Sequence, residues 1–295
     1  MKGKSVTSAT PLRHKSSLVV FGAVTFATSW GFWLIAIALG GSVKNSPSVI
    51  PYVLGGFGPV FGAIVVRVRR SRRRELAPAH TVRLRLSMRL CWVLPLLVMA
   101  SATVLAAALL ADRLGGPALS FAEGRNLISD IGGPVPFFVS MLVAGPLSEE
   151  PGWRGTAYPR LRASFGRLQA GLLLGVVWAI WHLPLFFITG TLQAGFGLIS
   201  WNGVLFVLTV IPMALLTGYA YERAGVAASI AVHLGVNATI ALLDVKSPVV
   251  LACIVAVQTI VAITLLAWQR DRGADLPVHA DSHPRQIVTS STEAP

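Results

Sequence analysis

Long apolar stretches alternate with short polar segments along this chain of 295 residues. Each apolar stretch has 17 to 22 residues. A helix rises about 1.5 Å per residue, so about 20 apolar residues cross a hydrocarbon core of about 30 Å. The pattern therefore predicts an all-α polytopic membrane protein with about eight transmembrane helices. The eight stretches are residues 18–39, 49–66, 90–111, 131–147, 170–189, 203–220, 225–243 and 249–268.

The first apolar stretch follows four basic residues and so imitates a signal peptide. Its apolar part is longer than the roughly 7 to 15 residues of a signal-peptide core. We therefore interpret residues 18–39 as the first transmembrane helix. The basic residues before it are Lys2, Lys4, Arg13 and Lys15.

The basic residues are divided unevenly between the polar segments. Translocation disfavours Lys and Arg, so these residues tend to stay in the cytoplasm. Alternate segments hold 21 Lys and Arg residues on one side and 4 on the other. This split predicts a multi-pass protein of the cell membrane with both termini cytoplasmic, and it favours an even number of spans. The four residues on the other side are Lys44, Arg113, Arg125 and Lys246.

The predicted spans divide the chain into five regions. Residues 1–17 form a cytoplasmic segment, and residues 18–130 hold three helices and a basic cytoplasmic loop. Residues 131–243 form a core of four spans, and residues 244–268 contain the last helix. The tail, residues 269–295, is polar and low in aromatic residues, which predicts disorder.

Composition agrees with this class and sets the expected partners. The chain has 54% hydrophobic and 13% charged residues, against about 25% charged in soluble domains. The net charge of +13 raises the question of nucleic acid, but no basic domain is interleaved with exposed aromatic residues. Membrane lipids are therefore the expected partners, and nucleic acid is not. The arginine run at residues 67–74 is either a topology anchor, which we favour, or a site for anionic lipid.

Cysteine and arginine usage add little to this picture. Cys91 and Cys253 lie far apart within apolar stretches and have no spacing typical of a disulfide framework or a zinc site. Arginine supplies 20 of the 25 basic residues, a bias that fits a GC-rich bacterial genome.

Two histidines stand out inside the apolar stretches. His182 and His233 are the only histidine, acidic or basic residues within the eight stretches. A charged group at the bilayer centre costs roughly 2.5 kcal/mol or more, so such residues usually serve a function. They therefore indicate an active site inside the helix bundle.

The first polar motif, SEEPGWRG at residues 148–155, begins where the fourth stretch ends. Glu150 and Arg154 are four residues apart, so on a helix the guanidinium can hold that carboxylate. Glu149 is then the carboxylate without this partner. Adjacent, partly desolvated carboxylates resist double ionisation, and one of them becomes a usable general base. The alternative is an ordinary interfacial charge cluster. Pro151 predicts a helix start or a kink directly after the pair.

The second and third motifs carry the histidines. His182 is predicted deep in an apolar helix, with Trp178 on the same face as an aromatic wall and Pro184 loosening the backbone nearby. His233 and Asn237 are four residues apart and share a helical face. The alternative is that these polar residues only hold helices together. Taken jointly, the motifs supply a base, a water-orienting imidazole and hydrogen-bond donors for an oxyanion, which is what a hydrolase needs.

These motifs resemble those of the CPBP intramembrane proteases, which include Rce1-type CAAX prenyl endopeptidases and bacterial Abi proteins. The resemblance rests on E-E-x-x-x-R at residues 149–154, aromatic-x-x-x-H at 178–182 and H-x-x-x-N at 233–237. It covers residues 131–243 and marks them as an Abi-like protease core. Trp178 stands where this family often has phenylalanine, which preserves the aromatic wall.

The resemblance implies a role for each residue. Glu149 and His182 would activate water, and His233 and Asn237 would stabilise the oxyanion. Glu150 and Arg154 would hold the shape of the motif. The family is commonly named a metalloprotease, and Glu149, His182 and His233 would be the ligands of a catalytic zinc. A metal-free glutamate mechanism uses the same residues, and we favour it over a tightly bound metal.

The expected function is hydrolysis of a peptide bond in a membrane-associated, lipidated or precursor peptide. Eukaryotic relatives imply a prenylated CAAX substrate, and a bacterial source makes another membrane-associated peptide the better expectation. A non-proteolytic immunity or scaffold protein on the same fold is the alternative. A small-molecule transporter is a further alternative, disfavoured because the two halves show no matching interrupted helices.

Overall fold

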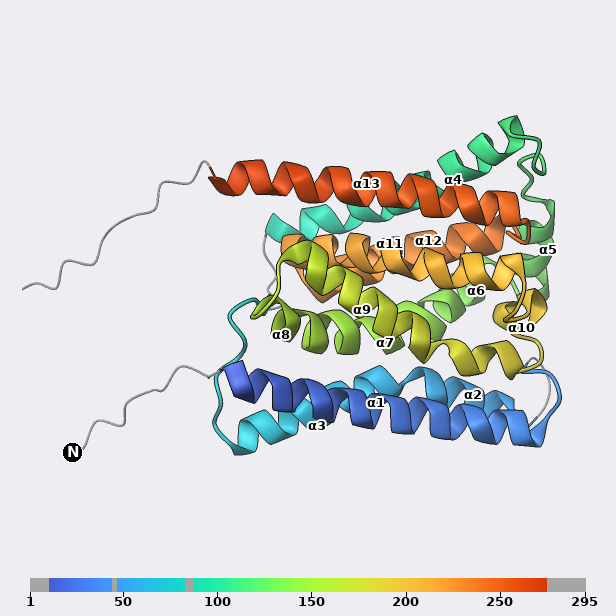
Figure 1. Ribbon diagram of the computed structural model, residues 1–295. Helices are drawn as coiled ribbons and strands as arrows, with labels where there is room; N and C mark the ends of the chain where they lie inside the picture. The colour runs from blue at the N-terminus through green and yellow to red at the C-terminus, as the bar shows by residue number, and fades with distance from the viewer. Residues whose placement is uncertain (1–10, 44–46, 83–87, 275–295) are drawn as a thin grey trace, which may run out of the picture.

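The structure is a computed structural model that describes residues 11–43, 47–82 and 88–274. Thirteen α-helices and no strands occur in these residues (Figure 1). The helices are α1 (Pro11–Leu39), α2 (Val49–Gly56), α3 (Gly58–Arg72), α4 (Val93–Arg113), α5 (Ala122–Asp130), α6 (Pro134–Leu142), α7 (Ser148–Gly152), α8 (Tyr158–Arg162), α9 (Arg167–Trp181), α10 (Leu192–Phe196), α11 (Trp201–Ala224), α12 (Val226–Leu242) and α13 (Pro248–Ala274).

Four shorter helical turns connect or interrupt these helices. Two are 3₁₀ turns, η1 (Met88–Trp92) and η4 (Leu183–Phe187). The other two are π-helical turns, η2 (Val143–Leu147) and η3 (Trp153–Ala157). Both π-helical turns flank α7, which carries the Glu-Glu pair.

The predicted all-α membrane fold is confirmed. Five helices are long and apolar enough to cross a membrane, and the number is seven if each of two bent pairs counts as one span. Helix α12 matches the predicted stretch 225–243, but its 17 residues make it shorter than these. The count of eight spans therefore stays a prediction.

The two bent pairs have local causes in the sequence. Helices α2 and α3 meet at 45° around Phe57, where Gly56, Gly58 and Pro59 interrupt regular helix. Helix α5 meets the next helical run at 90°. There Gly132 and Gly133 have φ of +94° and +110°, values that side chains rarely adopt.

A continuous helical run extends from Pro134 to Arg162 through α6, η2, α7, η3 and α8. The fourth apolar stretch ends at residue 147, whereas the helix continues to Arg162. Arg154 and Arg160 are buried inside the protein, so the polar residues of this segment do not mark the end of the helix. Pro151 lies inside α7, between the π-helical turns, and starts no new helix.

The helices form layers around this run (Figure 1). Helices α1, α2 and α3 pack together on one side of it, and α3 contacts α7. On the other side, α12 packs against α4 and α11, and α11 packs against α9 and α13. The Glu-Glu pair therefore lies in the interior of the bundle.

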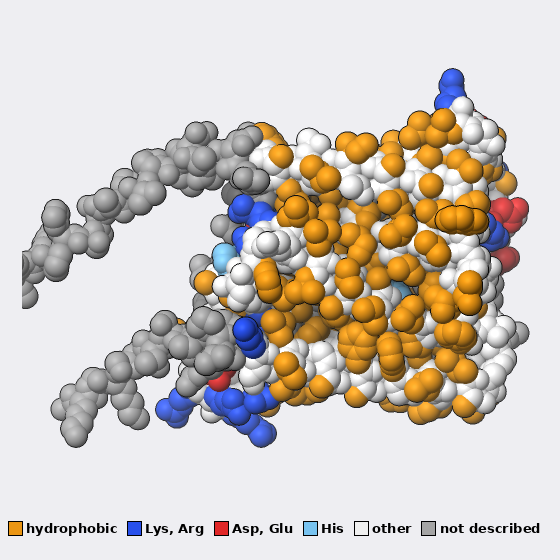
Figure 2. Space-filling view, viewed as in Figure 1, with side chains coloured by type: hydrophobic (Ala, Val, Ile, Leu, Met, Phe, Trp, Pro, Cys, Tyr) orange, Lys and Arg blue, Asp and Glu red, His pale blue; other side chains and the backbone are white. Residues whose placement is uncertain are grey.

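The start of α1, the end of α3 and the end of α13 lie at the same end of the molecule (Figure 1). Lys and Arg side chains gather there, over the end of α3, beside a mostly hydrophobic middle band (Figure 2). This arrangement agrees with termini on one side of the membrane. Helix α1 begins before the predicted boundary at residue 18 and α13 continues past residue 268. Disorder was predicted for residues 269–295, but residues 269–274 belong to α13, and residues 275–295 lie outside the described part of the chain.

Candidate active site

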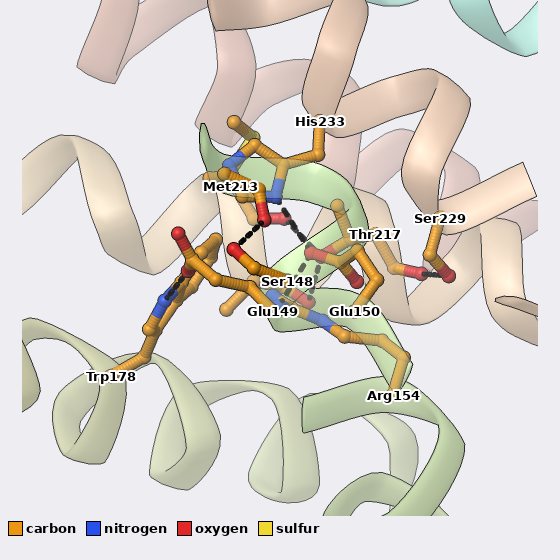
Figure 3. A network of polar contacts seen from close by, with 11 residues as sticks. Ser148, Glu149, Glu150, Arg154, Trp178, Met213, Thr217, Ser229 and His233 are labelled. Carbon is orange, nitrogen blue, oxygen red and sulfur yellow. Dashed lines mark hydrogen bonds and ion pairs between the residues drawn. The ribbon is translucent and has the colours of Figure 1, made fainter. Parts of the chain in front are cut away.

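Glu150 is the centre of a buried ionic cluster (Figure 3). Its Oε1 accepts a hydrogen bond from Nη1 of Arg154 at 3.0 Å, the predicted pair four residues apart. The same oxygen lies 2.8 Å from Nδ1 of His233 in α12. The side chains of Glu150 and Arg154 are fully buried. The cluster therefore ties α12 to the helical run, a contact that we did not expect from the sequence.

Glu149 points away from this cluster and has a partner of its own (Figure 3). Nε1 of Trp178 donates a hydrogen bond of 2.7 Å to Oε2 of Glu149. The guanidinium of Arg154 lies over the Trp178 ring, with Cζ 4.2 Å from its centroid. Trp178 is thus a hydrogen-bond donor to Glu149 as well as the expected aromatic wall.

The missing side chain of Gly145 leaves a space among three candidate residues. A Cβ atom at this glycine would lie 3.4 Å from Nδ2 of Asn237 and 3.7 Å from Nε2 of His233. It would also lie 3.7 Å from Oε1 of Glu149. A carboxylate oxygen, an imidazole nitrogen and an amide nitrogen therefore surround one point, although they come from two segments far apart in the sequence.

We expected His182 to lie deep within a helix. It lies instead at the C-terminal end of α9. Pro184 ends regular helix there because it lacks a backbone N–H, and the 3₁₀ turn η4 follows. Nδ1 of His182 lies 2.8 Å from the carbonyl oxygen of Trp178. A carbonyl can only accept, so Nδ1 carries the proton and Nε2 of a neutral ring is an acceptor.

The structure brings His182 to the site through ring contacts with Trp178. The ring centroids of His182 and Trp178 are 5.6 Å apart, and those of His233 and Trp178 are 5.2 Å apart. Among the described residues, His182 forms no hydrogen bond with Glu149. The expected pairing of these two residues on one water therefore stays a prediction.

The proposed zinc ligands do not form a metal site in this arrangement. Within the described part of the chain, no three His, Cys, Asp or Glu side chains are grouped as metal ligands. Nδ1 of His182 and of His233 lies against the carbonyl of Trp178 and the carboxylate of Glu150, respectively, a contact that metal-binding histidines also make, so it does not decide the question. We therefore derive no step of the reaction through a metal.

Two neighbours of the site were missed by the sequence reasoning. Gly145 precedes Pro146 in an apolar stretch, and a glycine offers no chemical group that would single it out. Tyr52 lines a cavity beside Glu149, but it lies almost a hundred residues away in the sequence. Only the fold relates these positions to the motifs.

Comparisons with known proteins agree with the motifs. Residues 131–239 match the family described as type II CAAX prenyl endopeptidase Rce1-like. The chain is also 27% identical over 197 residues to CAAX prenyl protease 2 of Methanococcus maripaludis. This alignment covers 65% of the chain and 71% of that relative. The matched segment contains all three motifs, which confirms the resemblance that we inferred from them.

Proposed function

We propose, on the premise that residues 131–239 carry the signature of Rce1-like CAAX prenyl endopeptidases, that this chain is an intramembrane endopeptidase. It would hydrolyse a peptide bond by means of water activated by Glu149. The observation that carries this proposal is the space at Gly145, where a base and two nitrogen groups surround one point. Hydrolysis needs a base for water and donors for the oxyanion.

In the proposed reaction, Glu149 accepts a proton from water, and the water oxygen attacks the scissile carbonyl carbon. Glu149 then returns the proton to the leaving amine nitrogen as the C–N bond breaks. The hydrogen bond from Trp178 to Oε2 of Glu149 leaves Oε1 directed toward the space at Gly145. Nε2 of His182, an acceptor by its tautomer, would help to orient the water.

The oxyanion would be bound by the amide of Asn237 and the imidazole of His233. Nδ1 of His233 faces the Glu150 carboxylate and donates to it. Nε2 is then a donor only when the ring carries both protons. In that form the charges of Glu149, Glu150, Arg154 and His233 cancel, which satisfies the need to pair buried charges. We propose that His233 acts as this doubly protonated donor.

The proposed substrate is a membrane-associated peptide. The name of the archaeal relative specifies a CAAX prenyl protease, so a lipid-modified peptide is the first class to test. An unmodified membrane-tethered peptide is the second. Both would be cleaved by a site inside the bundle of a multi-pass cell-membrane protein, and the distribution of basic residues favours access from the cytoplasm.

Two site substitutions test the function. Glu149→Gln keeps the size of the side chain and an oxygen that can accept from Trp178, but it removes the base. His182→Ala removes the second water-orienting group. We expect each to abolish cleavage of a membrane-tethered reporter peptide by the purified protein, and we expect Arg74→Ala to cleave at the wild-type rate.

Thermal unfolding in detergent must show that the variants fold. Cleavage at the wild-type rate by folded Glu149→Gln would contradict the proposed base. A wild-type protein that cleaves neither prenylated nor unmodified reporters would favour the scaffold alternative.

A further inference from the structure

A small cavity lies beside Glu149 and has a volume of about 40 Å³. Its floor belongs to the helical run, where Ala144, Ser148 and Glu149 line it. Its opposite wall comes from α1 and α2, which lie outside residues 131–239. A cavity of this size accommodates a water molecule or a few methyl groups.

The walls of the cavity are mostly large apolar side chains. They are Trp33 of α1, Tyr52 and Val53 of α2, Phe57 at the break before α3, Trp181 at the end of α9 and Leu185 in η4. The rings of Trp33 and Trp181 pack with centroids 4.6 Å apart. Nε1 of Trp33 donates to the carbonyl oxygen of Tyr52 at 3.0 Å. These contacts fix α2 against α1, so the cavity has a defined shape.

Two polar groups belong to residues in these walls. Nε1 of the buried Trp181 has no hydrogen bond within the described residues, and Tyr52 carries a hydroxyl group. Both are able to donate a hydrogen bond. A peptide next to Glu149 offers carbonyl oxygens that would accept from such donors. The cavity thus combines apolar walls with donors suited to a peptide backbone.

We propose that this cavity is the subsite for a small apolar side chain of the substrate, next to the scissile bond, and that Gly56 sets its depth. The inference rests on the proposed function and adds its side-chain specificity. Glu149 lines the cavity and also faces the space at Gly145. A substrate side chain in the cavity and the carbonyl at the space beside Gly145 would therefore both lie next to Glu149.

Gly56 offers a means to change the depth without disturbing the fold. A Cβ atom at this position would meet only Oγ of Ser148, at 3.9 Å, which is an ordinary contact. Alanine also has a higher helix propensity than glycine. Gly56→Ala therefore adds one methyl group to the cavity and leaves its surroundings in place. Gly22 in α1 is the matched control, because a Cβ there would meet no atom within 4 Å.

The test uses membrane-tethered reporter peptides that differ only in Ala, Val or Leu beside the scissile bond. One methylene group in an apolar pocket changes kcat/KM by about 10-fold or more. We expect Gly56→Ala to lower kcat/KM for the Val or Leu reporter by about 10-fold relative to the Ala reporter. Val53→Ala enlarges the cavity and should shift the preference the other way. Gly22→Ala should leave kcat/KM for the Val and Leu reporters, each relative to the Ala reporter, unchanged.

The outcomes separate this inference from the function itself. Suppose that the wild type cleaves the reporters and that Gly56→Ala and Val53→Ala prefer the same reporters as the wild type does. This result would contradict the proposed subsite but not the proposed endopeptidase activity. An equal loss for all three reporters in Gly56→Ala would also overturn the subsite, since that result indicates a cavity that holds only water. If the wild type cleaves no reporter of any class, the proposed function fails and the subsite fails with it.

Discussion

Gly145 lies between the proposed base, Glu149, and the proposed oxyanion donors, His233 and Asn237. The atoms around its absent side chain are 3.4 to 3.7 Å from the Cβ position, so a methyl group would fit without a clash. It would, however, occupy the space that we propose for the substrate carbonyl. Gly145 would thus contribute to the site because it has no side chain.

Gly145→Ala is accordingly expected to lower kcat/KM by about 100-fold, the loss typical when an oxyanion contact is removed. Stability should change little, because the added contacts are ordinary ones. Cleavage of a reporter peptide and thermal unfolding in detergent measure the two effects. Gly31→Ala is the control, since no atom lies within 4 Å of its Cβ position. Activity within 3-fold of wild type, roughly, would contradict the role of this space.

Individual residues were predictable where the relevant partners are close in sequence. The spacing of four residues predicted that Arg154 pairs with Glu150, and the structure has this pair. The same spacing put His233 and Asn237 on one face, and both lie beside Gly145. The bond from His233 to Glu150 joins residues 83 positions apart, and no local pattern encodes it.

At the scale of the helices, the ionic cluster joins α7, η3 and α12. Arg154 and Glu150 are both fully buried, and His233 supplies the third partner. Breaking a buried ion pair by removing one partner costs about 3 to 5 kcal/mol, because the remaining charge stays in a low-dielectric interior. The cluster is therefore a strong constraint on how α12 sits against the helical run.

We expect Arg154→Met to destabilise the protein by about 3 kcal/mol or more. The double variant Arg154→Met with Glu150→Gln should recover at least half of this loss, because it removes the uncompensated charge. Thermal unfolding in detergent, followed by tryptophan fluorescence, compares the variants. The control is Arg73→Met, which breaks the pair between the exposed Arg73 and the partly buried Glu75 at 4.0 Å and should cost less than about 1 kcal/mol. A double variant less stable than Arg154→Met would contradict this account.

The lengths of the apolar stretches predicted where helices occur, but for one helix the predicted end was wrong. The fourth stretch stops at residue 147 in the apolar count, whereas the helical run continues to Arg162. Hydropathy treats Glu149, Glu150 and Arg154 as polar residues in water. In the structure they are buried and partnered by one another, by Trp178 and by His233. A single sequence does not reveal such internal compensation.

At the scale of the whole molecule, the basic residues predict the orientation in the membrane. The end of α3 lies on the side where α1 begins, and α4 ends on the opposite side (Figure 1). Arg73 and Arg113 are both exposed at these two ends. The imbalance of 21 to 4 basic residues in the sequence predicts that the end of α3 lies in the cytoplasm.

Single cysteines at these positions test the orientation. In a background with Cys91 and Cys253 replaced by serine, a membrane-impermeant maleimide applied to intact cells should label Arg113→Cys and leave Arg73→Cys unlabelled. Permeabilised cells should give labelling of both. Labelling of Arg73→Cys in intact cells would reverse the assigned topology.

The break at Phe57 has a consequence for how relatives are classified. It turns α2 so that Gly56 and Phe57 reach the cavity beside Glu149, yet both residues lie before the segment that defines the Rce1-like match. Side-chain preference would then depend partly on a stretch of the gene outside the one that encodes the three motifs. Proteins with the same three motifs could then differ in substrate specificity through their first two helices. Grouping them by motif alone would place enzymes that act on different peptides in one class.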